Sequence, residues 1–209
     1  MTESRGRRER SSLGADEILA ATERVAEEGF EALTMRAVAS ELRSAPMSLY
    51  RYFPTKDDLV AALLDRVLQR VALDPPTTDW ANDLERFAQA HRRVLSDHPW
   101  AIRALFARPD PGPGAALVAE HALAILARGG RTGRDAVAGF SAILALNYGW
   151  AAFDSPDRTE QEILDGMLGL PAEHFPHTRA VAEPLSQYSS DDNYSRALRI
   201  TIDGITGAV

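Results

Sequence analysis

Between Thr34 and Lys56 the chain carries side chains that can bind phosphate groups and contact the edges of nucleic-acid bases. Arg36, Arg51 and Lys56 are cations, and hydroxyl groups stand at Ser48 and at the two tyrosines beside Arg51. Phosphate oxygens accept hydrogen bonds from all of these groups, and Arg and Ser can also discriminate between base edges in a groove. So many cationic and hydroxyl side chains in one short segment indicate a binding surface, provided that the local fold exposes them to solvent.

Two short helices must position these groups. Apolar residues recur at i, i+3, i+4 and i+7 from Met35 to Leu42, which predicts a short amphipathic helix. A second helix is predicted between Pro46 and Pro54, because Pro fits a first helical turn and disfavours helical geometry at the residue before it. Tyr50 points outward from this helix. A DNA major groove is the natural partner of such a helix.

The region from Ala15 to about residue 70 resembles the DNA-binding domain of the tetracycline-repressor (TetR) family of transcriptional regulators. The family implies an all-α protein with an N-terminal three-helix helix-turn-helix domain and a larger C-terminal helical domain for ligand binding and dimerisation. The all-α class also agrees with the absence of sustained strand-like alternation. The motifs that carry the resemblance are Thr34-Met35-Arg36, Leu49-Tyr50-Arg51-Tyr52-Phe53, and Lys56 just after Pro54.

The sequence departs from the family pattern at the turn between the two short helices. Members usually have Gly and an aliphatic residue there, whereas this chain has Arg43-Ser44-Ala45. If φ is positive at Arg43, Gly would adopt the conformation at lower cost. Ser44 is a possible N-cap of the helix that follows.

The resemblance also implies roles for individual residues in contact with double-stranded DNA. Arg36 would reach a base edge or a phosphate, residues at the start of the second helix would meet base edges, and Lys56 would contact the backbone. The implied DNA-binding residues are Thr34, Arg36, Ala45, Pro46, Met47, Ser48, Tyr50, Arg51, Tyr52 and Lys56.

The net charge of −7 by itself disfavours a nucleic-acid partner. The acidic residues are unevenly placed, however, because residues 1–70 hold 11 Lys and Arg against 12 Asp and Glu. A local basic footprint is what phosphate contact requires. The N-terminal arginines form either a solubilising tail or an arm that contacts phosphates or the minor groove. They are Arg5, Arg7, Arg8 and Arg10.

The chain divides into three regions on its breakers and helical patterns. We predict a basic flexible arm over 1–14, a helix-turn-helix domain over 15–71 and a ligand-binding and dimerisation domain over 79–209. The Pro-rich segment 74–79 is the predicted hinge, and Thr55 to Asp58 has the pattern of a capping box at the start of a helix.

Several classes of protein are disfavoured. With no cysteine, disulfides and thiolate metal sites are excluded, and the N-terminus has no apolar core of a secretory signal. The apolar segment 136–153 is expected to be a buried helix and not a membrane span, so we expect a cytoplasmic protein. We predict no cofactor, no metal site and no catalytic residues. A small helical enzyme, or a protein-interaction module that has lost DNA reading, remains an alternative.

Small residues at heptad spacing mark two helices of the C-terminal region. Such stripes let helix axes approach closely. Because the corresponding helices of the resembled family form a four-helix bundle with a twofold mate, we predict a homodimer seam; packing of the two helices within one chain is the alternative. The stripe residues are Ala138, Ala142, Ala145, Gly149 and Ala152, and then Ala197, Thr201, Gly204 and Ala208.

A small-molecule pocket among the middle helices is a further implication of the resemblance. Aromatic bulk with a few polar tips suits a small apolar or aromatic ligand, although any single aromatic residue at helical spacing is more often part of the core. The predicted function is a transcriptional regulator, a repressor released from a quasi-palindromic operator by this ligand. The candidate lining residues are Phe87, His91, Trp100, Leu105, Phe106, His121, Tyr148 and Trp150.

Overall fold

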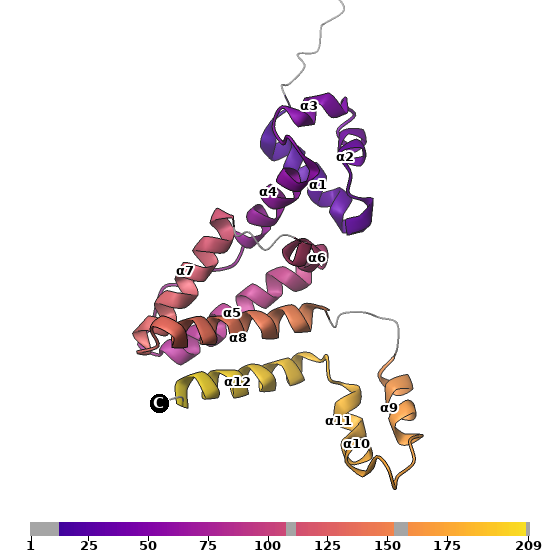
Figure 1. The fold of residues 1–209 in the computed structure, drawn as a ribbon, viewed down its shortest axis with the longest axis vertical. Coiled ribbons are helices and arrows are strands. Elements are labelled where there is room, and N and C mark those ends of the chain that lie inside the picture. The colour runs from indigo at the N-terminus through magenta and orange to yellow at the C-terminus, as the bar shows by residue number, and fades with distance from the viewer. Residues whose placement is uncertain (1–12, 108–111, 153–158, 208–209) are drawn as a thin grey trace, which may run out of the picture. The chain divides into compact units, whose positions relative to one another are not determined.

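The computed structural model describes residues 13–107, 112–152 and 159–207. These residues form helices joined by short connections (Figure 1), and no strand occurs among them. The predicted all-α class is therefore confirmed. Packing divides the chain into two units between Leu64 and Asp65, which lie inside one helix, α4.

The N-terminal unit is built from short helices around a small apolar core. Ile18, Val38, Leu49 and Leu63 are fully buried in it. Helix α2 packs on both α1 and α3, as a helix-turn-helix requires. Its elements are α1 (Ala15–Glu27), the 3₁₀ turn η1 (Phe30–Ala32), α2 (Met35–Glu41), α3 (Pro46–Tyr50) and the first part of α4 (Lys56–Leu68).

The start of α4 confirms the predicted capping box. The amide of Asp58 donates to Thr55 Oγ1 at 3.0 Å, and the amide of Thr55 donates to the Asp58 carboxylate at 3.1 Å. Two otherwise unsatisfied donors are thus paired locally, which fixes where the helix begins.

The turn between α2 and α3 is closed by a residue in the left-handed region. Arg43 has φ +50°, its amide donates to Ser40 O, and the next amide, that of Ser44, donates to Ala39 O, both at 2.9 Å. This is the Schellman pattern, in which Gly is the usual residue. The N-cap of α3 is Ala45, not Ser44. Ser44 lies one residue too early, and its hydroxyl is buried without a partner in the described parts of the chain.

The strain at Arg43 gives a stability prediction. Replacing Arg43 by Gly removes a left-handed cost of about 1–2 kcal/mol and adds an unfolded-state entropy cost of about 0.5–1 kcal/mol, so we expect a net gain of about 0.5–1 kcal/mol. Arg43→Val should instead cost about 1–2 kcal/mol, because a branched Cβ fits this region poorly. Urea unfolding measures both. A loss of stability in Arg43→Gly would contradict the assignment of backbone strain to Arg43.

The C-terminal unit is a bundle in which α5 is central. Helix α5 packs against α7, α8 and α12, and α8 packs against α7 and α12. Between α8 and α12 the chain forms α9, α10 and α11, of which α9 packs against the other two (Figure 1). No described helix is long and apolar enough to span a membrane. The helices are α5 (Trp80–Asp97), α6 (Trp100–Ala107), α7 (Pro113–Arg128), α8 (Gly133–Ala152), α9 (Glu160–Leu168), α10 (Pro176–Ala180), α11 (Ala182–Ser186) and α12 (Asp191–Gly207).

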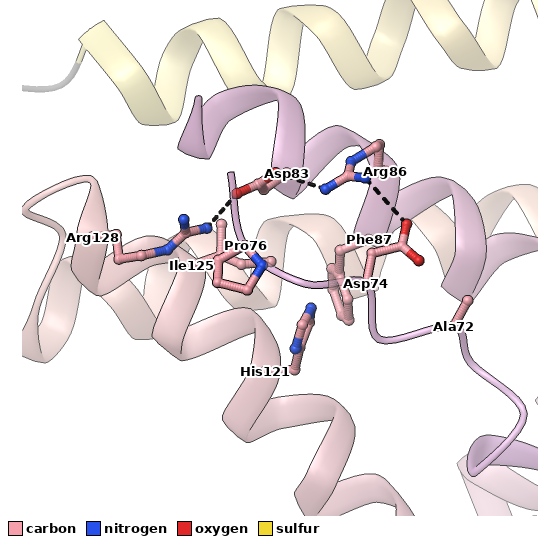
Figure 2. A pocket seen from close by; sticks show the side chains of 9 residues that line it. All are labelled: Ala72, Asp74, Pro76, Asp83, Arg86, Phe87, His121, Ile125 and Arg128. Atoms are coloured by element: carbon pink, nitrogen blue, oxygen red, sulfur yellow. Dashed lines mark hydrogen bonds and ion pairs between the residues drawn. The ribbon is translucent and has the colours of Figure 1, made fainter. Parts of the chain in front are cut away.

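A buried carboxylate fixes the Pro-rich segment that precedes α5. The side chain of Asp83 is only 3% exposed and accepts hydrogen bonds from Arg128 at 2.5 Å and Arg86 at 2.8 Å. Thr77 in the segment donates to it from both its amide and its hydroxyl, at 2.8 Å each. Figure 2 shows Asp83 between the two guanidinium groups beside a small cavity. The predicted hinge is thus held to α5 and α7 by one ionic cluster.

This cluster predicts an acid-sensitive contribution to stability. The guanidinium group of Arg128 and the Thr77 donors hold the pKa of Asp83 well below its usual value despite burial. The stabilisation is therefore present above the unfolded-state pKa near 3.8 and is lost as pH falls toward the lower folded-state pKa. We expect Asp83→Asn to lower the melting temperature by about 5–10 °C at pH 7. The difference in melting temperature between wild type and Asp83→Asn should become smaller below about pH 4. A difference that does not change with pH would contradict an ionic origin of the stabilisation.

Candidate nucleic-acid interface and effector site

Helix α3 presents one face outward and buries the other. Leu49 is fully buried and anchors the helix, whereas Met47 is 74% and Tyr50 is 42% exposed. Pro46 occupies the first helical turn, as predicted. Large apolar and aromatic side chains left uncovered on a helix of this length form a surface suited to contact with another molecule.

Several other predicted DNA-binding residues already have intramolecular partners. Thr34 Oγ1 caps α2 by accepting from the Ala37 amide at 3.1 Å. The Ser48 hydroxyl donates to Ala45 O. The Lys56 ammonium lies 5.7 Å from the centre of the Phe30 ring. These contacts fix side chains around α3 and leave Arg36 and Arg51 exposed beside them.

One predicted DNA contact has a different partner in the structure. The hydroxyl of Tyr52 donates to the backbone oxygen of Leu13 at the start of α1. A hydroxyl has a single proton to donate, so in this state the Tyr52 proton is used by the residue that precedes the Gly14 N-cap of α1.

In the C-terminal unit the structure joins five of the predicted pocket residues through ring contacts. The ring of Phe87 lies 6.1 Å from His91, nearly parallel, and 6.0 Å from His121. Tyr148 lies 5.9 Å from His91 and 6.0 Å from Phe106. The five rings come from α5, α6, α7 and α8, and Phe106 is 70% exposed at the edge. The result is an aromatic cluster that runs from the interior to the surface.

The other three predicted pocket residues lie elsewhere or make no ring contact with this cluster. Trp150 packs edge-on against Tyr194 at 5.7 Å. Trp100 packs against His98, and its indole nitrogen is buried without a partner in the described residues. Leu105 is partly buried on α6. The described contacts of these three do not distinguish a pocket residue from a core residue, so the core interpretation, favoured for each from the sequence, stands.

A buried polar chain, which the sequence did not reveal, adjoins the aromatic cluster. The Asn147 amide nitrogen lies 2.9 Å from Ala88 O and 3.0 Å from His91 Nδ1, and Tyr194 donates its hydroxyl to Asn147 Oδ1 at 2.8 Å. If the Asn147 amide donates to Nδ1, the proton of neutral His91 is on Nε2. Burial lowers the pKa of His91 to about 4, so the ring is neutral at pH 7. The only sequence signal was an Asn inside an apolar helix.

Among the described residues, parts of the predicted stripes of small residues face open space, although α8 and α12 also pack against each other within the chain. Cβ atoms added at Gly149 or Gly204 would meet nothing within 4 Å, whereas one at Gly139, off the stripe, would lie 3.2 Å from Leu126. Ala138, Ala142, Thr201 and Gly204 instead line an open groove of about 460 Å³. Ala142, Ala145 and Ala152 are exposed and Ala197 is partly buried. Ala208 lies outside the described residues, as does the N-terminal arm up to residue 12.

Two family models cover most of the chain. The model of bacterial regulatory proteins of the tetR family matches residues 18–63, and the model of the tetracyclin repressor-like C-terminal domain matches residues 73–209. The chain belongs to the TetR family. Members of this family regulate transcription by binding DNA, so the prediction of a DNA-binding regulator and not an enzyme is confirmed. Among the described residues, no group of three or more His, Asp or Glu is placed to hold a metal ion.

Individual TetR relatives agree with this assignment. A transcriptional regulator of Saccharopolyspora erythraea is 34% identical over 165 residues, which are 78% of this chain and 69% of that protein. The transcriptional repressor DrrR1 of Streptomyces coeruleorubidus is 33% identical over 168 residues, which are 78% of this chain and 60% of DrrR1. The crystal structure of Streptomyces coelicolor ActR in complex with (S)-DNPA has a TM-score of 0.87 and 27% identity. That match covers 95% of this chain and all of that one.

Proposed function

We propose that this TetR regulator is a homodimeric repressor that reads a quasi-palindromic operator and is released from it by a small aromatic ligand. The observation that carries the proposal is the uncovered face of α3, with Met47 and Tyr50 exposed on a helix anchored by buried Leu49. In a helix-turn-helix, side chains at the start of such a helix meet base edges in the major groove. DrrR1, a repressor by name, supports the sign of regulation. Such a protein would act on DNA in the cytoplasm.

The exposed small-residue stripes support the dimer. An open groove on α8 and α12 lets a second pair of helices approach closely, and exposed Ile200 and Val137, at 73% and 59%, would supply apolar area beside it. A twofold axis would present two α3 helices to two half-sites, so the operator would be a quasi-palindrome.

The aromatic cluster supports the ligand class. Phe87, Tyr148 and His121 offer ring faces and edges, and a neutral His91 adds a polar group without placing a charge in the bundle. The ActR complex with (S)-DNPA makes that compound a rational first probe. A ligand releases the operator only if it binds the released state more tightly than the DNA-bound state.

The first experiment incubates the protein with sheared genomic DNA at physiological salt and sequences the recovered fragments. We expect one enriched quasi-palindrome that is absent when Tyr50→Ala is used. If folded wild-type protein recovers all genomic fragments equally, the proposal that it binds a specific DNA sequence would be overturned. We then add (S)-DNPA to the protein bound to the enriched duplex. If the wild type releases the duplex and Phe87→Ala does not, the aromatic cluster would be supported as the ligand site.

Lys56 supplies a separate test of how the protein contacts the DNA backbone. Lys56 is exposed in the first turn of α4. A lysine that contacts a phosphate positions the protein on DNA but does not discriminate between base pairs. We expect Lys56→Ala to weaken binding to all duplexes similarly and to reduce the slope of log K against log salt by about one unit per site. A change in sequence preference would instead assign Lys56 to base contact.

A further inference from the structure

His91 lies in the middle of the aromatic cluster and is almost completely buried. It is 1% exposed, and its ring lies 6.1 Å from that of Phe87 and 5.9 Å from that of Tyr148. Burial lowers the pKa of His91 to about 4. The imidazole is therefore neutral at pH 7, and one of its nitrogens donates a hydrogen bond while the other accepts.

The partners of Asn147 identify the nitrogen of His91 that carries the proton. Ala88 O can only accept, so the side-chain atom of Asn147 that lies 2.9 Å from it is the amide nitrogen. The same nitrogen lies 3.0 Å from His91 Nδ1. Because an amide nitrogen only donates, Nδ1 must accept, and the single proton of the neutral ring is on Nε2.

The Nε2–H group of His91 is a buried donor without a partner. Among the residues that the structure describes, none makes a hydrogen bond to this nitrogen. One ring carbon separates Nε2 from Nδ1, so the Nε2–H bond points away from Asn147. A buried donor that stays unpaired destabilises the protein, and an acceptor on a molecule bound among the rings would satisfy it.

We propose that His91 Nε2–H recognises the effector, and that the effector is a flat, uncharged aromatic molecule whose carbonyl oxygen accepts this hydrogen bond. The inference rests on the ligand-released repressor proposed above. A carbonyl oxygen suits the donor because it accepts without bringing a proton that would need an acceptor of its own. The rings of Phe87 and Tyr148 suit a flat aromatic partner. Asn147 is a positioning residue, because it acts by fixing the proton of His91 on Nε2.

The first test uses the full-length wild-type protein without DNA. The probes are fluorenone and fluorene, which differ by one carbonyl oxygen, and equilibrium dialysis measures the dissociation constant of each at pH 7. We expect fluorenone to bind about tenfold more tightly, because only its oxygen pairs the buried donor. Without such a donor, the carbonyl group would lose its hydrogen bonds to water, and fluorene would bind at least as tightly. Failure of fluorenone to bind, or to bind more tightly than fluorene, would overturn the proposal.

Variants of His91 connect this preference to the Nε2–H donor. His91→Leu removes the donor, so we expect the preference for fluorenone to fall below about twofold. His91→Gln places an amide donor near the position of Nε2 and should keep a preference of about fivefold. Tyr194→Phe is the matched control, because it removes a hydrogen bond to Asn147 and leaves the His91 donor in place. Thermal melting checks each fold, and a full preference in His91→Leu would contradict the assignment.

Nuclear magnetic resonance locates the proton in the wild-type protein. Labelling the five histidines with nitrogen-15 distinguishes protonated from unprotonated ring nitrogens, and the His91 signals are those that His91→Gln lacks. We expect a protonated Nε2 and an unprotonated Nδ1 at pH 7. A proton on Nδ1 would overturn the proposal.

A charged probe tests whether the effector is uncharged. Fluorenone-4-carboxylate keeps the rings and the carbonyl group of fluorenone and adds a negative charge. We expect it to bind at least about tenfold more weakly than fluorenone, because burial of a carboxylate beside a neutral imidazole is unfavourable. Tighter binding of the carboxylate would show that the ligand class is anionic and would contradict the proposal.

Failure of this inference can be distinguished from failure of the proposed function. The probe measurements need no DNA, whereas the operator is found by enrichment of genomic fragments without any probe. If a palindrome is enriched but fluorenone is not preferred over fluorene, operator reading stands and carbonyl recognition fails. If fluorenone binds through His91 and no palindrome is enriched, carbonyl recognition stands and operator reading fails.

Discussion

Tyr50→Ala should lose about 100-fold in operator affinity while the protein remains folded. Tyr50 is 42% exposed on a helix that is anchored by fully buried Leu49, so we expect the fold to tolerate removal of its ring. A residue that contacts a base or phosphate contributes about 1–3 kcal/mol, and a dimer makes that contact twice. Binding isotherms on the enriched duplex, with urea unfolding beside them, measure the two effects separately.

The hydroxyl and the ring of Tyr50 can be separated by a milder substitution. Tyr50→Phe keeps a ring that can touch a thymine methyl group and loses only the hydroxyl, so we expect a smaller loss, about tenfold, that is similar for all sequences. Wild-type affinity and selectivity in Tyr50→Ala would mean that α3 does not read DNA.

Ile200→Glu should convert the dimer into monomers and thereby remove operator binding. Ile200 is 73% exposed on α12, beside the small-residue stripe, so the substitution disturbs nothing inside one chain. In a dimer seam, however, it would bury an unpaired carboxylate, which is strongly unfavourable. We expect light scattering to give the mass of one chain at micromolar concentration. Operator affinity should fall at least about 100-fold, because the two half-sites are then bound independently.

Two further variants make this test specific to the seam. Gly149→Leu fills space that is open within the chain and improves helix propensity, so it should also dissociate the dimer without loss of monomer stability. Leu117→Glu makes a similar apolar-to-acid change at a 56% exposed position on α7, outside the stripe, and should leave the mass of two chains unchanged. A dimeric mass for Ile200→Glu and Gly149→Leu alike would place the interface elsewhere.

The N-terminal unit shows how far local sequence signals reach. The capping box at Thr55, the Pro residue that opens α3 and the apolar spacing of α2 each act over a few residues, and each is present as predicted. The strain expected at Arg43 also follows from one turn, and its φ is positive. The boundary between the units could not be read in this way. It falls within α4, whose final turn packs with the second unit, and not at the Pro-rich segment.

What the sequence by itself determined was the helical class, the helix-turn-helix and the outward face of α3, because capping, proline geometry and apolar periodicity are set by neighbours along the chain. Only the tertiary structure decided which distant side chains meet. His91 and Asn147 are 56 residues apart, Asp83 and Arg128 are 45 apart, and Tyr52 meets Leu13 across 39. Polar partners of this kind are chosen by how helices pack and by the need to satisfy each buried donor and acceptor. Periodicity along one helix carries no information about that choice.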